Sequence, residues 1–204
     1  MVKNDTLGKL FGSPQRVKVM RLFLFNPEDT YDVDDASKRT KSSKIVIRKE
    51  LSSLLSAGLL KKKIFFKKRE GKATKGKKKV PGFALDKDFH YLSALQNLLI
   101  KIPPFTSSDL EKRFKGSGSV KLLIISGVFL QEWESSADIL IVGDKLNHTS
   151  IDRAVSSLEA EIGRELTYAV FDTAEFEYRT NVHDKLVRDI LDFPHEKIVN
   201  RLGI

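Results

Sequence analysis

The sequence contains no cysteine among its 204 residues, so it offers no disulfide, no thiolate nucleophile and no thiolate metal ligand. Its four histidines are scattered without the spacing of a metal site: His90, His148, His183 and His195. No apolar run approaches the roughly 18 residues that span a bilayer, and the first ten residues lack the order of a secretory signal. We therefore expect a soluble, cytoplasmic protein with no membrane partner, no resident metal and no cofactor.

Acidic residues are scarce in the first half of the chain. Residues 1–103 carry 24 Lys and Arg against 10 Asp and Glu, a net charge of +14, whereas residues 104–204 carry 12 against 17, a net charge of −5. Pro103 and Pro104 lie at this change of composition, and proline punctuates regular structure. We expect two domains, 1–103 and 104–204, of which the basic one meets a polyanion. Nucleic acid is the first candidate.

Three helices are predicted in the basic half. Ser13-Pro14 predicts the start of an apolar helix that ends before Asn26-Pro27, with Arg16, Lys18 and Arg21 directed outward. A short helix follows, capped by Asp32, and then a turn at residues 40–41. A third helix runs from Ser42 or Ser43 to residue 57, where Gly58 ends it. Its inward stripe is Ile47, Leu51, Leu54 and Leu55, and its opposite face carries Lys44, Ile45, Arg48 and Lys49.

A basic β-hairpin is predicted after the third helix. Residues 59–68 and 80–85 have the composition of strands, and residues 69–79 form a Gly- and Lys-rich turn. Eleven basic residues lie between Lys61 and Lys79, against the single acid Glu70. Contact with phosphates explains this composition. A self-repelling loop without a partner and a basic targeting tract are the alternatives.

These features resemble a winged helix-turn-helix of the ArsR or MarR type over about residues 6–100. The similarity lies in the segment LFGS at 10–13 and in SKIVIRKELSSLLSAGLL at 43–60, with its Leu-x-x-Leu-x-x-x-Gly-Leu ending. The resemblance implies a homodimer that reads double-stranded DNA, with the third helix in the major groove, the hairpin on the backbone and residues 91–100 as a dimer or linker helix. The candidate DNA contacts are Ser42, Ser43, Lys44, Ile45, Arg48 and Lys49 on the helix, with Lys67, Lys68, Arg69, Lys72 and Lys75 on the hairpin.

The acidic half predicts an α/β or α+β layer, which makes the whole chain α+β. Strands are expected over 120–125, 139–142 and 166–171, and helices over 108–114, 150–162 and 175–191. Over residues 117–202 this order resembles the minimal nucleotidyltransferase domain of the DNA polymerase β superfamily. That family has a Gly-Ser pair followed by two aspartates, whose carboxylates hold Mg²⁺ for attack on a nucleotide α-phosphate. The matching positions here are Ser126, Gly127, Ser136 and Asp138.

Only Asp138 keeps a metal-binding side chain at these positions, and two Mg²⁺ ions need converging carboxylates. The resemblance thus implies a degenerate domain that dimerises, binds a protein partner or senses a small-molecule effector. The chain is predicted to be a transcriptional regulator. Two alternatives stay open: an active Mg²⁺-dependent nucleotidyltransferase, with Glu132 or Glu134 as a replacement ligand, and an antitoxin-like protein whose acidic half binds a partner.

Overall fold

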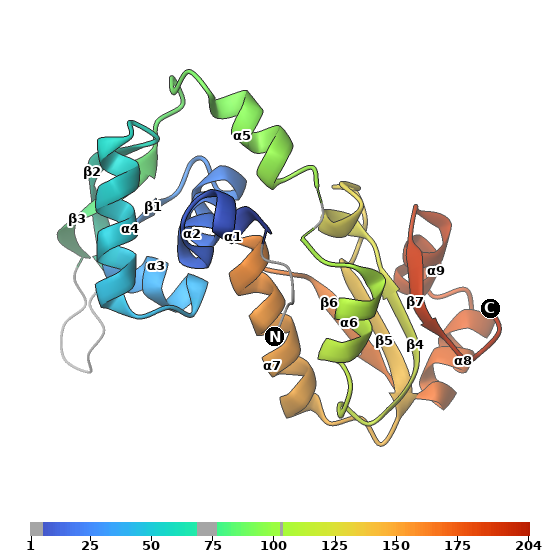
Figure 1. Ribbon diagram of the computed structural model, residues 1–204. Coiled ribbons are helices and arrows are strands. Elements are labelled where there is room, and N and C mark those ends of the chain that lie inside the picture. The colour runs from blue at the N-terminus through green and yellow to red at the C-terminus, as the bar shows by residue number, and fades with distance from the viewer. Residues whose placement is uncertain (1–5, 69–76, 103) are drawn as a thin grey trace. The chain divides into compact units, whose positions relative to one another are not determined.

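The computed structural model describes residues 6–68, 77–102 and 104–204. The protein is α+β, with two small sheets, and Figure 1 labels its elements. The chain divides into two compact units. The first comprises Met1–Ile102 with Glu159–Arg164, and the second comprises Pro103–Leu158 with Glu165–Ile204. Within the described ranges, no helix is both long and apolar enough to cross a membrane.

Among the described residues of the first unit, four helices come before the two strands of the hairpin. They are α1 (Thr6–Leu10), α2 (Pro14–Phe25), α3 (Val33–Thr40) and α4 (Lys44–Ser56). The predicted cap of α2 is confirmed, since Ser13 Oγ accepts a hydrogen bond from the Arg16 N–H at 3.1 Å. The predicted inward stripe of α4 is confirmed for Ile47, Leu51 and Leu54, which are buried in the same core as Phe23 of α2. Its fourth residue, Leu55, is only half-buried. Burial of these apolar faces holds the helices together.

The prediction that Arg21 faces outward is wrong. Its exposed fraction is 5%, and its Nε donates to the carbonyl of Leu99, at the end of α5 (Leu92–Leu99), at 3.0 Å. A buried guanidinium needs such acceptors, because it has lost its hydration. The apolar residues of α5 pack on the same core as α2. This segment, expected to be a dimer or linker helix, therefore packs within the first unit.

The sheet of the first unit contains β1 (Thr30–Tyr31), β2 (Leu60–Lys68) and β3 (Lys77–Leu85), in the order β1-β3-β2. All its pairs are antiparallel, and the hairpin register runs from Leu60 opposite Leu85 to Lys68 opposite Lys77. Gly82 is required in β3 because the Phe65 ring fills the space that a Cβ would need. The predicted hairpin is thus present, with β3 starting earlier than expected.

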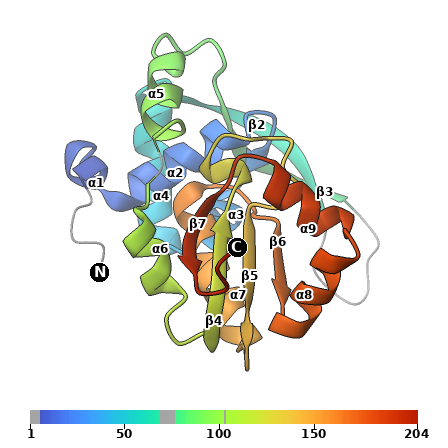
Figure 2. The ribbon, with the colours of Figure 1, turned by 90° about the vertical axis from the view of Figure 1, so that its right-hand side faces the viewer.

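The second unit is built on a sheet of order β6-β5-β4-β7, in which only β5 and β6 are parallel. Its strands are β4 (Ser119–Ile125), β5 (Ile139–Asp144), β6 (Tyr168–Phe171) and β7 (Glu196–Asn200). Its helices are α6 (Ser107–Arg113), α7 (His148–Ile162), α8 (Thr173–Asn181) and α9 (Lys185–Asp192). Figures 1 and 2 show α8 and α9 on one face of the sheet, and α6 with α7 on the other.

The single helix expected over 175–191 is wrong, because the chain forms two helices there. His183 adopts a left-handed conformation with φ 57° between them. Asp184 then starts α9, and its Oδ1 accepts hydrogen bonds from the N–H groups of Leu186 and Val187. Strand β7 was not predicted, since its short apolar centre is flanked by Lys197 and Asn200. This strand matters because it borders a cavity described below.

Candidate nucleic-acid interface

The turn between α3 and α4 is held by its own side chains. Lys41 ends α3 in a left-handed conformation, with φ 49°. Ser37 Oγ donates to the Ser42 carbonyl at 2.6 Å, and Ser42 Oγ donates to the Thr40 carbonyl at 3.1 Å. Ser43 Oγ accepts from the Val46 N–H at 3.5 Å, as an N-cap does. The hydroxyls of Ser42 and Ser43, both candidate DNA contacts, therefore stabilise the turn and the start of α4.

An ion pair fixes the inner face of α4 to α2. The Glu50 side chain lies among the buried apolar residues of α4, with an exposed fraction of 5%, and its Oε2 accepts from Arg16 Nε at 2.8 Å. Arg16 also donates to the carbonyl of Phe11 at 3.1 Å. A buried carboxylate requires such a partner. Together with the buried apolar residues of α4, this pair contributes to which side of the helix points to solvent.

The outward face of α4 presents an exposed apolar residue between two basic ones. Ile45 is 80% exposed, and Arg48 and Lys49 are exposed beside it. Within the described part of the chain, neither Arg48 nor Lys49 forms an ion pair. Lys44 lies at the edge of this face and pairs with Asp34 at 2.9 Å. The structure therefore brings four of the candidate residues onto one solvent-facing surface.

Lys67 of the hairpin is bound to the start of α3. Its Nζ lies 2.9 Å from Asp32 Oδ2 and 2.5 Å from Asp35 Oδ1, while Asp32 Oδ1 caps α3 by accepting from the Asp35 N–H at 2.8 Å. The charge of Lys67, a candidate DNA contact, is thus neutralised by two carboxylates within the first unit. The side chain of Lys68, and the whole of Arg69, Lys72 and Lys75, lie outside the described residues.

This cluster keeps its groups ionised. Partial burial acts to raise the pKa of Asp32, but hydrogen bonds from the Asp35 N–H and from Lys67 outweigh it and lower that pKa below its usual value. Burial likewise acts to lower the pKa of Lys67, but its hydrogen bonds to Asp35 and Asp32 raise it. The last residues of β2 and the first turn of α3 are therefore joined by charges that persist around neutral pH.

The sequence prediction missed an apolar surface on the hairpin. Ile64 and Phe66 are 69% and 61% exposed, and they share one face of β2 because strand residues alternate. Lys79 pairs with Phe66 across the hairpin, and its Nζ lies 5.7 Å from the centre of the Phe66 ring. The spacing of Ile64 and Phe66, two residues apart in a predicted strand, was the signal for this face. Mixed cationic and aromatic surfaces of this kind suit contact with nucleic-acid backbone and sugars.

In the second unit, Asp138 has a structural role. Its Oδ1 accepts from the Val128 N–H at 2.7 Å, and its Oδ2 accepts from the Thr167 N–H at 2.8 Å. Gly127, with φ 54°, lies directly against Oδ1, where a Cβ would overlap the carboxylate. Asp138 therefore connects the turn after β4 to the segment before β6.

The two serines of this motif also form hydrogen bonds within the second unit. Ser126 Oγ donates to the Pro194 carbonyl at 2.8 Å, and Ser136 Oγ donates to Asp189 Oδ2 at 3.1 Å. Ser126, Gly127 and Asp138 are neighbours, whereas Ser136 lies beside α9. Among the residues with described positions, no group of three or more His, Asp or Glu side chains is placed to hold a metal ion.

Comparisons with protein-family models, with curated proteins and with solved structures find no match for this chain.

Proposed function

We propose that the protein is a transcriptional regulator whose first unit is a winged helix-turn-helix that binds double-stranded DNA. One observation carries this proposal: the outward face of α4 presents Ile45, Arg48 and Lys49, and no carboxylate of the described residues neutralises either basic residue. The order of α2, α3, α4, β2 and β3, with the tight turn after α3, supports it. This is the arrangement in which such domains place one helix in the major groove.

The residues of this face differ in what they offer to DNA. Arg48 suits bidentate hydrogen bonding to a guanine edge, and Ile45 suits apolar contact with a thymine methyl group. Lys49, and Lys44 at the edge of the face, suit phosphates. On the hairpin, the exposed Lys62 and Lys63 would neutralise the backbone and make binding dependent on salt.

The second unit, in the same proposal, is a nucleotidyltransferase-like domain that does not catalyse and instead supports dimerisation or sensing. The hydrogen bonds that both Asp138 oxygens accept from backbone N–H groups support this, because they give the carboxylate a structural role. Two Mg²⁺ ions, moreover, need several converging carboxylates. A homodimer fits DNA sites with twofold symmetry. Light scattering on the purified chain should then give twice the mass of one chain.

DNA binding is tested by fluorescence anisotropy. Duplexes are selected from a random pool and titrated over a range of salt concentrations. Arg48→Ala should cost about 1–3 kcal/mol on the selected site and much less on random DNA. Arg188→Ala is the matched control, since Arg188 is exposed on α9 and its ion pair with Asp192 is long, at 3.8 Å. Equal losses on selected and random DNA, or no selected sequence, would refute the proposal.

A further inference from the structure

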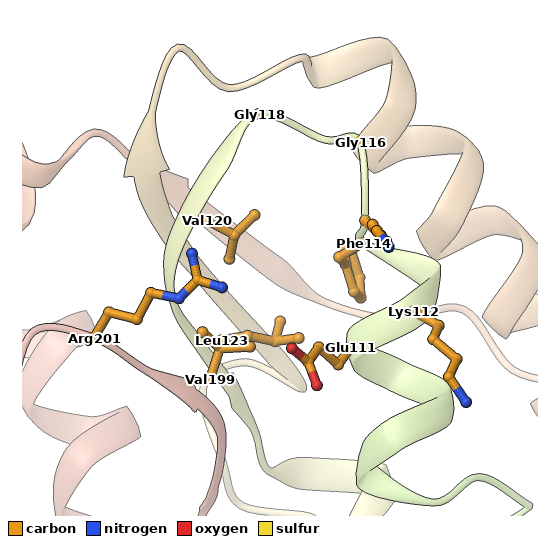
Figure 3. Close-up of a pocket in the computed structure, with 10 residues that line it drawn as sticks. Glu111, Lys112, Phe114, Gly116, Gly118, Val120, Leu123, Val199 and Arg201 are labelled. Carbon is orange, nitrogen blue, oxygen red and sulfur yellow. The ribbon is translucent and has the colours of Figure 1, made fainter.

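A cavity of about 320 Å³ lies within the second unit, between α6 and the strands β4 and β7 (Figure 3). This volume is at the lower end of the range of small-molecule sites. Its wall is formed by the last residues of α6, the loop at 115–118, and one face of the two strands. The candidate motif around Asp138 does not contribute to it.

The inner part of the cavity is apolar. Leu123 of β4 and Val199 of β7 are register partners and lie side by side on the sheet. Phe114, with an exposed fraction of 3%, closes the side formed by α6. Arg201 follows directly after β7, so the chain passes from the apolar wall at Val199 to a charged group at the opening.

Arg201 and Glu111 carry opposite charges at this opening but do not form an ion pair with each other (Figure 3). Figure 3 shows the Arg201 guanidinium extending over the cavity from the sheet and the Glu111 carboxylate extending into it from α6, whereas the Lys112 amine points away. Within the described residues, neither Arg201 nor Glu111 has an ion pair, and neither side chain has a hydrogen-bonding partner. A ligand with one negative and one positive end would satisfy both groups at once.

We propose that this cavity binds a free α-amino acid with an apolar side chain. The planar guanidinium of Arg201 matches the carboxylate, which it can bind through two hydrogen bonds. Glu111 matches the ammonium group, and the side chain of the amino acid packs on Leu123 and Val199. A simple anion would satisfy Arg201 but would leave Glu111 without a partner.

The ligand site itself depends only on the cavity. Its use as the sensor of a regulator rests on the proposed function. Ligand binding and the sensor role are therefore tested in separate experiments, and ligand binding is measured in the absence of DNA.

The ligand is tested by isothermal titration of the full chain with L-leucine and with three probes. L-Leucinamide lacks the carboxylate, 4-methylpentanoate lacks the ammonium group, and inorganic phosphate supplies an anion alone. L-Leucine should bind, and loss of either charged group should weaken binding about tenfold or more, because each leaves a charge of the protein unmatched. No saturable heat with leucine, or equal binding of leucine and 4-methylpentanoate, would overturn the proposal.

Variants separate the two charges. Arg201→Gln and Glu111→Gln should each weaken leucine binding about tenfold or more. Lys185→Gln is the control, because Lys185 is exposed on α9 and does not line the cavity, and it should bind leucine as the unaltered chain does. Circular dichroism checks that all three variants fold. If phosphate binds as tightly as leucine and Glu111→Gln strengthens it, the site is one for inorganic anions and the amino-acid proposal fails.

The sensor role is then examined by adding leucine to the anisotropy titrations. A shift in DNA affinity that Arg201→Gln abolishes supports it. Unchanged DNA affinity, with leucine binding intact, contradicts the sensor role alone.

Discussion

Arg16 of α2 holds Glu50 of α4 through a 2.8 Å hydrogen bond between Nε and Oε2, at a point where the rest of the α4 inner face is apolar. Two helices that pack through apolar contacts alone can rotate slightly about their axes without losing those contacts. A hydrogen-bonded ion pair such as Arg16–Glu50 keeps its short distance only over a narrow range of helix orientations. The pair therefore contributes to the orientation of the outward face that carries Arg48 and Lys49.

Arg16→Gln should lower the free energy of unfolding by about 1–3 kcal/mol, because it leaves the buried Glu50 carboxylate without its charged, half-exposed partner. Urea unfolding followed by circular dichroism measures the change. Arg48→Gln is the control, since Arg48 is exposed and unpaired among the described residues, and it should change stability by no more than about 0.5 kcal/mol. Similar small losses for both variants would show that the pair does not hold α4.

The Asp32 and Lys67 cluster predicts a pH dependence of stability. The folded pKa of Asp32 is lowered, so its contribution is present above the unfolded pKa of about 3.9 and is lost as the pH falls through the folded value. Asp32→Asn should therefore lower stability by about 1 kcal/mol at pH 7, and the difference should shrink in strong acid. Unfolding is measured from pH 7 to pH 2. A difference that stays constant over this range would contradict the prediction.

The same cluster responds in alkali through Lys67. Its folded pKa is raised, so its contribution is complete below the unfolded pKa of about 10.4 and disappears as the pH rises through the folded value. Lys67→Met should flatten the alkaline end of the stability profile. Lys63→Met, at an exposed position of the same strand, should leave that profile as it is.

A substitution at Ile45 should affect DNA binding but not stability, because the Ile45 side chain is 80% exposed. Ile45→Ala should leave the unfolding free energy within about 0.5 kcal/mol. It should nevertheless weaken binding to the selected duplex, since it removes apolar contact at the centre of the proposed interface. Anisotropy and urea unfolding are run on the same preparation. A loss of stability without a loss of binding would place Ile45 in the packing of the unit.

Asp138→Asn should destabilise the protein by about 1–3 kcal/mol, because an amide offers one oxygen acceptor where the carboxylate serves two backbone N–H groups. Thermal unfolding with and without Mg²⁺ distinguishes this role from metal binding. Mg²⁺ should leave the melting temperature of the unaltered chain unchanged. A Mg²⁺-dependent rise that Asp138→Asn removes would make Asp138 a metal ligand after all.

The helix starts were predictable because capping is local. Asp32 and Ser43 each accept from a backbone N–H three residues further on, and these residue types signal that geometry within one turn. The outward face of α4 followed from the periodicity of the helix for the same reason. Such features depend on only a few neighbouring residues.

Distant partners were not predictable. Arg21 is buried because it meets the carbonyl of Leu99, which is 78 positions away, and a single sequence contains no sign of that contact. The partner of Lys67 was not predictable either. Alternation along the strand indicates the face on which Lys67 lies, but it does not indicate that Asp32 lies within ion-pair distance on that face. The cavity between α6 and β7 depends on a strand whose short pattern gave no signal.

The ion cluster between the end of β2 and the start of α3 has an evolutionary consequence. Asp32 both starts α3 and accepts the charge of Lys67 from β2, so a change at position 32 alters a helix and a strand together. Loss of Lys67 in turn leaves Asp32 and Asp35 as neighbouring like charges. Positions 32, 35 and 67 should therefore vary together among related sequences, and a chain that has lost one of the three should have replaced the others.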